Sequence, residues 1–347
     1  MAAFMHSAPC WVDVQLPDLE AGKRFYGELF GWTFRAGEEV ERGGPCVDAL
    51  SGGKLVAALA AKKDGRMPTA WGIYFATDDI AATVTTIRQA GGQVITEPVR
   101  VGSAGVLAQA ADPGGAVFGL WQAGDRSGFH KQNEPGSFCW TEVYTRQKDR
   151  VDAFYEQVFG FRGTDLGAAG MGEPGMGESG RDESGTREPG TGGSGTTEAG
   201  TDAPGPAGSG TGEPRTGETG RGESETPGSE TPGSETPGSG PVGSGIGGSG
   251  ADAPGVDFRM WSPAGTEPGP DTAIGGRSVI TDAFPAEMPS YFLTYFAVAD
   301  CDATAETGVH LGGRVSVPPF DIPYGRMAVL HDNQGAEFAV LQPPVSR

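Results

Sequence analysis

The hexapeptide CWVDVQ at residues 10–15 returns as CWTEVY at residues 139–144. At the same spacing, FYGELFGW at residues 25–32 returns as FYEQVFGF at residues 154–161. Asp13 of the first hexapeptide becomes Glu142 in the second, so the acidic character of the position is kept. Two distant segments that share both a strand-like hexapeptide and the aromatic stretch behind it indicate an internal duplication.

The second copy contains a long insertion. DPGGAVF at residues 112–118 matches DNQGAEF at residues 332–338, a larger spacing than the first matches have. Residues 163–255 account for the difference: they hold 30 of the 60 glycines, include three SETPG repeats, and lack aromatic residues. Such a composition buries too little apolar surface to offset the entropy of ordering. We therefore expect a disordered insertion at about 163–255, and predict that deleting residues 165–252 leaves the melting temperature and ligand binding essentially unchanged.

Each copy reads as two similar halves. Residues 11–15 have strand character, Asp18 is a suitable N-cap for the helix that follows, and Gly31 ends that helix. The second half repeats this order, with a strand at residues 73–76 and a helix between Asp79 and the glycines that follow it. The sequence therefore predicts an α+β fold of four βαβββ units.

Charge and composition exclude several classes of protein. The formal net charge is −20, of which −11 falls in residues 163–255, and no basic stripe with aromatic residues is visible. Nucleic-acid binding is therefore not expected. No apolar run reaches the roughly 20 residues that span a bilayer, and the N-terminus lacks the features of a signal peptide. The four cysteines form no C-x-x-C pair, so we expect a reduced, cytoplasmic protein without disulfides.

These motifs resemble the vicinal oxygen chelate superfamily, which includes glyoxalase I, bleomycin-resistance proteins and extradiol dioxygenases. The resemblance is carried by Asp18…Phe25-Tyr26…Phe30-Gly31 and by the turn at residues 112–115, and the C-W-x-[DE] opening is similar to tandem glyoxalase-like proteins of actinobacteria. It covers residues 8–123, 136–162 and 256–342. It implies two cup-shaped domains, at residues 1–123 and 136–347, joined by a linker at 124–135.

The resemblance also implies where a divalent metal would be held in metal-using relatives. None of the residues at those positions of this sequence can ligate a metal; they are Trp11, Gly72, Gly119, Trp140, Leu293 and Ala339. Solvated or helix-capping roles are expected for all four histidines, which are His6, His130, His310 and His331. We therefore predict no metal and no other cofactor.

Strand alternation predicts which side chains face each cup. If Val12 and Val14 face the helix, then Trp11, Asp13 and Gln15 face the first cup, and Trp140, Glu142 and Tyr144 face the second. A carboxylate beside an indole is poorly solvated, so Asp13 and Glu142 are candidate acid/base residues. The alternative is an exposed carboxylate near the cup rim, or one that pairs with a nearby arginine or backbone donor. The candidate ligand-binding residues are Trp11, Gln15, Tyr74, Trp121, Trp140 and Tyr144.

Two function classes remain open at this stage. The first is a metal-free protein whose cavity binds a small hydrophobic or aromatic molecule, in the manner of bleomycin-resistance relatives. The alternative is a small-molecule enzyme, such as a glyoxalase-like lyase, isomerase or hydroxylase, that uses Asp13 or Glu142 as acid/base or holds a metal unconventionally. One copy could serve only as a scaffold. In that case we expect it to be the second copy, which the insertion interrupts. We expect a monomer with pseudo-twofold tandem domains or a weak dimer.

Overall fold

The computed structural model describes residues 4–37, 45–166 and 257–344. The first four residues of the predicted insertion, 163–166, belong to a strand that ends at Leu166. The rest of the predicted insertion, residues 167–255, lies outside the described residues.

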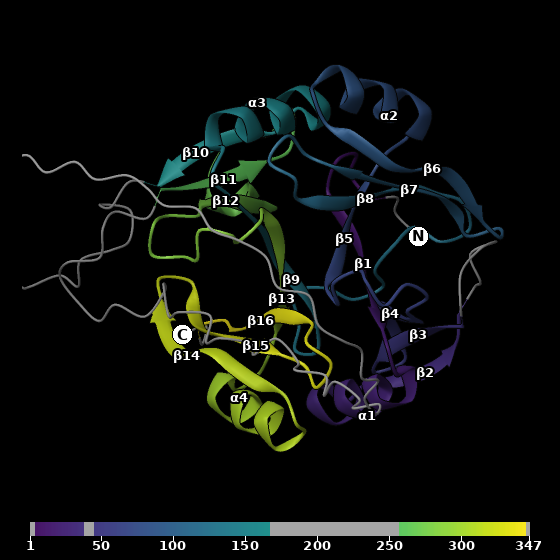
Figure 1. The fold of residues 1–347 in the computed structure, drawn as a ribbon, viewed down its shortest axis with the longest axis vertical. Coiled ribbons are helices and arrows are strands. Elements are labelled where there is room, and N and C mark those ends of the chain that lie inside the picture. The colour runs from purple at the N-terminus through teal and green to yellow at the C-terminus, as the bar shows by residue number, and fades with distance from the viewer. Residues whose placement is uncertain (1–3, 38–44, 167–256, 345–347) are drawn as a thin grey trace, which may run out of the picture. The chain divides into compact units, whose positions relative to one another are not determined.

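The first copy consists of eight strands and two helices (Figure 1). In chain order these are β1 (Pro9–Leu16), α1 (Leu19–Phe30), β2 (Thr33–Ala36), β3 (Cys46–Ser51), β4 (Lys54–Ala61), β5 (Trp71–Ala76), α2 (Ile80–Gln89), β6 (Gln93–Val101), β7 (Gly105–Ala111) and β8 (Val117–Ala123).

The second copy repeats that order, with one added 3₁₀ turn, η2. Its elements are β9 (Ser137–Thr145), α3 (Lys148–Phe159), β10 (Arg162–Leu166), β11 (Phe258–Ser262), η2 (Pro270–Thr272), β12 (Gly275–Val279), β13 (Tyr291–Ala297), α4 (Cys301–His310), β14 (Arg314–Ile322), β15 (Gly325–His331) and β16 (Glu337–Gln342).

Each copy builds one eight-stranded mixed sheet. The first sheet has the order β2-β3-β4-β1-β5-β8-β7-β6, and the second has the equivalent order β10-β11-β12-β9-β13-β16-β15-β14. The two halves of a copy meet where β1 pairs antiparallel with β5, or β9 with β13. In each half the opening strand also pairs in parallel with the closing strand, as β1 does with β4. The predicted α+β fold of four βαβββ units, in two glyoxalase-like cups, is confirmed.

Local capping explains where the helices begin and end. Asp18, Asp79 and Asp300 each accept a backbone hydrogen bond three residues ahead, at 2.9 to 3.0 Å, which satisfies a free N–H of the first turn. Gly31 and Gly160 end α1 and α3 in the left-handed conformation, each with φ of 68°, which favours glycine. No described helix is long and apolar enough to cross a bilayer.

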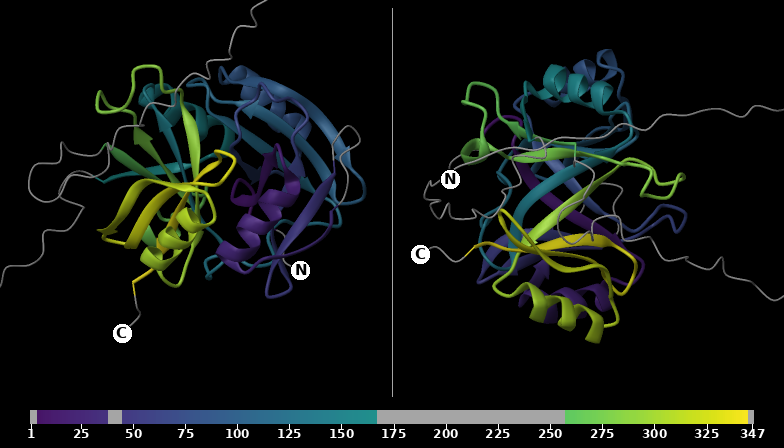
Figure 2. Two further views of the ribbon diagram at one scale, coloured as in Figure 1. Left: turned by 60° about the horizontal axis from the view of Figure 1, so that its bottom comes forward. Right: turned by 90° about the vertical axis from the view of Figure 1, so that its left-hand side faces the viewer.

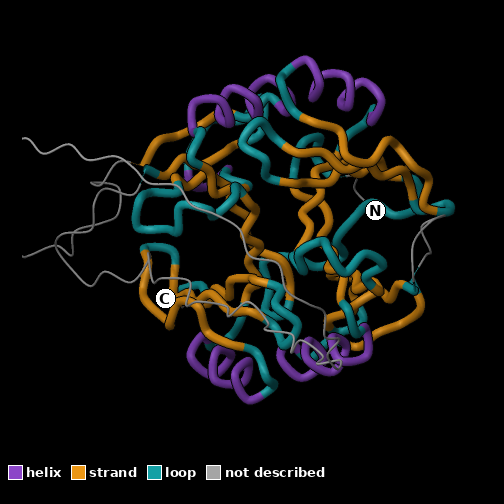
Figure 3. Tube along the Cα trace, in the orientation of Figure 1, coloured by secondary structure: helices purple, strands orange, loops and turns teal. Residues whose placement is uncertain are grey.

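The main apolar core joins the two copies. Trp71 on β5 contacts Phe296 on β13, with ring centroids 4.9 Å apart, and Phe75 contacts Phe292 at 5.9 Å. The helices flank this core in two pairs, α1 with α4 and α2 with α3, so each pair takes one helix from each copy (Figures 1, 2 and 3). Among the described residues the opposite face of each sheet carries no helix, and we call these the first and second cup faces.

Two tyrosine–aspartate hydrogen bonds link the copies in equivalent places. The Tyr26 hydroxyl on α1 donates to Oδ2 of Asp332 at 2.9 Å, and the Tyr155 hydroxyl on α3 donates to Oδ2 of Asp112 at 3.2 Å. The other carboxylate oxygen of each aspartate caps its own turn, accepting backbone N–H groups two and four residues ahead. Each turn of the D-x-x-G type therefore holds the helix of the other copy.

Candidate functional site

The alternation of β1 agrees with the expected division between core and first cup face. Val12 and Val14 are fully buried in the main core. Asp13 is partly buried on the other face, and Gln15 is exposed there. Trp11 is 7% exposed and lies opposite Tyr74 of β5. Gln15 therefore lies at the open edge of the face, away from its buried part.

Strand register sets two rows of residues across the first cup face. The first row crosses β2, β3, β4, β1 and β5, and each residue is the cross-strand partner of the next: Arg35, Asp48, Ala58, Asp13 and Gly72. The second row crosses β1, β5, β8, β7 and β6 in the same way: Trp11, Tyr74, Gly119, Gln109 and Thr96.

Asp13 and Tyr74 connect the two rows. The Tyr74 hydroxyl donates to Oδ2 of Asp13 at 2.9 Å. Burial raises the pKa of Asp13 to about 6, and the hydrogen bond from Tyr74 opposes that rise. A carboxyl group that titrates close to neutral pH can both accept and release a proton, which is what an acid/base role needs.

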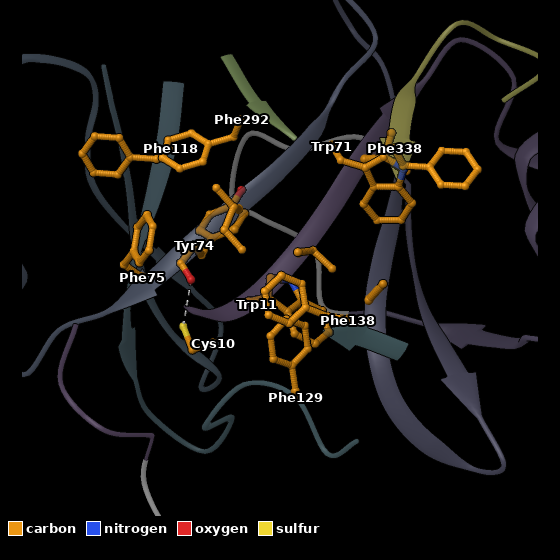
Figure 4. Close-up of a cluster of buried hydrophobic side chains, with 14 of the residues drawn as sticks. Cys10, Trp11, Trp71, Tyr74, Phe75, Phe118, Phe129, Phe138, Phe292 and Phe338 are labelled. Atoms are coloured by element: carbon orange, nitrogen blue, oxygen red, sulfur yellow. Dashed lines mark hydrogen bonds between the residues drawn. The ribbon is translucent and has the colours of Figure 1, made fainter. Parts of the chain in front are cut away.

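Sequence reasoning missed the charged group that covers Trp11. Asp48 is 2% exposed and accepts hydrogen bonds from Arg126 at 3.0 and 3.1 Å and from Arg35 at 3.1 and 3.2 Å. The Arg126 guanidinium carbon lies 5.3 Å from the centroid of the Trp11 ring, a cation–π distance. Phe129, also from the linker, packs on Trp11 with ring centroids 5.8 Å apart (Figure 4). Arg126 and Phe129 lie in the linker, which has no alternating strand pattern from which these contacts could have been predicted.

Glu142 is the centre of the second cup face. Trp140 donates its indole N–H to Oε1 of Glu142 at 3.0 Å, and the Ser278 hydroxyl donates to Oε2 at 3.3 Å. Burial raises the pKa of Glu142, while hydrogen bonds from Trp140, Tyr144, Tyr295 and Ser278 oppose the rise. The carboxyl group is therefore held in place by donors on its own strand, β9, and on the neighbouring strands β12 and β13.

Aromatic and aliphatic side chains surround Glu142. Tyr144 stacks on Tyr291 with ring centroids 5.1 Å apart and an interplanar angle of 16°, and Trp140 lies opposite Tyr295. These residues belong to an apolar cluster that is separate from the main core. Its partly buried members are Cys139, Trp140, Phe284, Tyr291, Phe320, Ile322 and Leu341. The second cup face thus offers apolar surface to a ligand, whereas Trp11 on the first is covered by the linker.

The sequence-predicted residues fall into two groups on different sheets. Trp11, Asp13, Gln15, Tyr74 and Trp121 lie on strands of the first sheet. Trp140, Glu142 and Tyr144 lie on β9 of the second sheet. A catalytic site that uses Asp13 and Glu142 together therefore has no support in this arrangement, and each acid has its own set of partners.

The expectation that His331 has a solvated or capping role is wrong. His331 is at the end of β15, its side chain is 12% exposed, and Nδ1 lies 2.7 Å from the Ser316 hydroxyl. The sheet register places it between Arg314 and Glu337, which could not be read from the sequence because these residues lie on three strands. His310 does lie in the last turn of α4, as expected.

The donor set at the family's metal positions does not fit a divalent ion. Trp11 and Trp140 open the two copies, and neither indole is a usual metal ligand. A Cβ atom added to Gly119 would lie 2.1 Å from Cδ1 of Tyr74, so the Tyr74 ring covers the place from which a ligand side chain would project. Among the described residues no cluster of three or more His, Cys, Asp or Glu side chains is arranged to hold a metal. We therefore derive no chemistry through a metal.

A groove of about 410 Å³ lies elsewhere, between α4 and β14. Its lining includes Val309, Pro318 and Pro319, with Asp302 and Glu306 from the helix. It is outside both cup faces and contains none of the predicted site residues.

Comparisons with known proteins agree with this architecture. Residues 10–120 match the model of the Glyoxalase/Bleomycin resistance protein/Dioxygenase superfamily. The chain is 30% identical over 345 residues to a protein of Mycobacterium bovis named "Putative glyoxylase CFP32", covering 98% of this chain and 96% of the relative. It is 28% identical to "Anthracycline biosynthesis protein DnrV" of Streptomyces peucetius, covering 99% and 95%.

Among solved structures, the Mn(II)-bound glyoxalase of Novosphingobium aromaticivorans is similar in fold. Its TM-score is 0.50 at 12% sequence identity, and the match covers 97% of this chain and 83% of that one. Together with the four βαβββ units and the full-length similarity to the mycobacterial relative, these findings show that the chain belongs to the glyoxalase/bleomycin resistance protein/dioxygenase superfamily.

Proposed function

We propose that the chain binds a small, flat aromatic molecule on the second cup face without using a metal. The observation that carries this proposal is the partly exposed aromatic surface of Trp140 and Tyr291 beside the buried carboxyl group of Glu142. Small-ligand sites are mostly apolar, with a few polar groups that fix orientation. Trp140 and Tyr291 would supply the flat contact, and Glu142 the hydrogen bond.

The chemistry of one relative supports an aromatic ligand. The printed name of the Streptomyces peucetius protein assigns it to anthracycline biosynthesis, and anthracyclines contain planar fused rings. Because the second copy carries the exposed aromatic surface, we infer that it is the binding copy. This reverses the expectation that the interrupted copy is only a scaffold.

Titration of tryptophan fluorescence with the planar dye alizarin tests this proposal. We expect saturable quenching that EDTA does not change. Trp140→Ala should weaken binding about tenfold, which corresponds to about 1.4 kcal/mol of lost stacking and burial. Trp11→Phe is the matched control and should leave the affinity unchanged, because Arg126 and Phe129 already cover Trp11. Loss of binding in the Trp11 variant alone, or on adding EDTA, would refute the proposal.

A second candidate function is acid/base catalysis on the first cup face. It is favoured by one observation, the carboxyl group of Asp13 with its pKa raised to about 6 and its hydrogen bond from Tyr74. Here Asp13 would take a proton from a weakly acidic carbon or hydroxyl group, and Tyr74 would stabilise the carboxylate.

The cytoplasmic location, the sequestration role and the monomeric or weakly dimeric state expected from the sequence stay predictions. Native mass spectrometry of freshly purified protein tests the oligomeric state and would reveal a bound molecule or metal.

A further inference from the structure

Ser316, His331 and Glu337 form a chain of polar groups across three neighbouring strands of the second sheet. The Ser316 hydroxyl lies 2.7 Å from Nδ1 of His331, and Nε2 of His331 lies 3.7 Å from Oε1 of Glu337. Neither proposed function uses these residues. A nucleophile next to a base, with the base next to a carboxylate, is the arrangement by which hydroxyl groups are activated in acyl transfer.

Strand register explains why these three side chains meet. His331 on β15 pairs directly with Glu337 on β16 and with Arg314 on β14. The pairing of β14 with β15 is irregular between Val315 and Val317, so Ser316 sits at a β-bulge. A bulge redirects a side chain relative to a regular strand, and here the Ser316 hydroxyl meets the imidazole of the neighbouring strand.

The surroundings of His331 keep its imidazole neutral. Burial, helped by the positive charge of Arg314, lowers the pKa of His331 to about 4, so near pH 7 the imidazole can accept a proton, as a weaker base than an exposed histidine. Oε1 of Glu337 lies 3.7 Å from Nε2, beyond hydrogen-bond distance. In the tautomer that carries the proton on Nε2, the lone pair of Nδ1 accepts the Ser316 O–H. The side chains of His331 and Glu337 are 12% and 23% exposed, so a small reagent can reach them.

We propose that Ser316 is an activated nucleophile, with His331 as its general base and Glu337 as a positioning residue, and that it accepts acyl groups from aryl esters. The acyl class follows from the hydroxyl–imidazole pair. The aryl preference rests on the proposed function, because Tyr291, next to Glu337, belongs to the aromatic surface that would hold the ring.

The proposed reaction has two balanced steps. In the first, Oγ of Ser316 bonds to the ester carbonyl carbon while its proton moves to Nδ1 of His331. The bond to the aryl oxygen then breaks, and the departing phenoxide takes that proton, leaving acyl-serine and a phenol. In the second, water attacks the acyl-serine, giving one proton to Nδ1. That proton returns to Oγ as the bond to Ser316 breaks, and a carboxylic acid is released.

Labelling of the full-length chain with a fluorophosphonate probe, followed by peptide mass spectrometry, tests the nucleophile. We expect an adduct on Ser316 that is absent in Ser316→Ala. His331→Gln should slow labelling on the order of 100-fold, as expected for loss of a general base. Ser290→Ala is the matched control and should leave labelling unchanged, because the Ser290 hydroxyl donates to the Thr145 hydroxyl at 3.1 Å and no histidine is among its described hydrogen-bond partners. Near-ultraviolet circular dichroism checks that each variant folds.

Hydrolysis of phenyl acetate, compared with hydrolysis of hexafluoroisopropyl acetate, an alkyl ester whose leaving group is of similar acidity, tests the preferred class of ester. Faster turnover of the aryl ester that Ser316→Ala and His331→Gln abolish, but Glu337→Gln only reduces, is the expected result. An intact protein with no adduct on Ser316, or with labelling that is the same in His331→Gln, would overturn the proposal. Labelling without alizarin binding would instead remove only the aryl preference and the proposed function.

Discussion

Two acids on the first cup face, the partly buried Asp13 and the buried Asp48, illustrate how neighbouring side chains set the behaviour of a carboxyl group. Asp13 and Asp48 both pair with Ala58, from opposite sides, so they lie in one row across the sheet. Asp48 is bound by two arginines, whereas Asp13 has a neutral hydroxyl donor, Tyr74. The charge of Asp48 is therefore compensated and that of Asp13 is not.

Substitution of Asp13 by Asn should stabilise the protein at neutral pH. The pKa of Asp13 is raised from 3.8 to about 6 in the folded chain, so folding favours the protonated form. This contribution is fully present below about pH 4 and is lost as the pH rises through 6. Asp13→Asn removes the penalty, worth at most about 3 kcal/mol and less because the side chain is partly exposed. Thermal unfolding at pH 4 and pH 7.5 should show a gain at the higher pH only.

Asp48→Asn is the matched control for this experiment. It leaves Arg126 without its anionic partner and should lower the free energy of unfolding by about 3 kcal/mol. A destabilised Asp13 variant at pH 7.5 would contradict the interpretation that the Asp13 charge is uncompensated.

Residue type and periodicity predicted the strands and caps but not the partners of the acids. The alternation of β1 placed Asp13 away from the core because period two depends only on the local sequence. Asp48 and Arg126, which form an ion pair, lie 78 positions apart in the sequence. Arg126 belongs to the linker, whose sequence has no hydrophobic periodicity from which its partner could be predicted. The Ser316–His331 pair depends on a bulge, which shifts the register by one residue and leaves no clear mark in the sequence.

At the scale of elements, helices α1 and α3 are each fixed by a turn of the other copy. Tyr26 and Tyr155 on these helices are both fully buried. The sequence did not predict that their hydroxyl groups reach Asp332 and Asp112, because helical period cannot show which copy a helix packs against.

Removing the two tyrosine hydroxyl groups should destabilise the chain unequally. Tyr155→Phe deprives Asp112 of one donor and should cost about 1 to 2 kcal/mol. Tyr26→Phe should cost about 1 kcal/mol more, because the Tyr26 hydroxyl also accepts the indole N–H of Trp71 at 3.0 Å. Urea unfolding measures both, and Tyr324→Phe, at a side chain 41% exposed, should have no effect. Equal losses for the two buried tyrosines would show that the Trp71 bond contributes nothing.

At the scale of the whole molecule, the described part of the chain shares one main core between its two sheets. Trp71, Phe75, Phe292 and Phe296 meet across β5 and β13, so neither copy buries its helix-bearing face alone. The second cup face has its own apolar cluster. Substitutions in the shared core should therefore affect both copies, whereas Trp140→Ala should act on the second copy alone, by removing aromatic surface and one hydrogen-bond donor to Glu142.

The strands on either side of the insertion determine what its removal should do. Leu166 at the end of β10 pairs with Phe258 at the start of β11, and the Asp257 carboxylate accepts a hydrogen bond from Arg277 at 2.7 Å. The deletion of residues 165–252 predicted from sequence would cut into β10, so the better replacement spans residues 167–256.

Replacing residues 167–256 with Gly-Asn-Gly should leave the fold unchanged and the melting temperature equal or higher. Both strand ends already lie in register, and a short turn suits two antiparallel strands. Loop-closure entropy falls by about 0.6 kcal/mol for each halving of a flexible loop, so the shorter connection can only help if the insertion makes no stabilising contact. A variant with residues 167–256 shuffled at constant composition is the control, and it should match the natural chain in melting temperature and alizarin affinity. If the replacement lowered the melting temperature by several degrees while the shuffled chain did so too, specific contacts of the insertion would have to be part of the folded state.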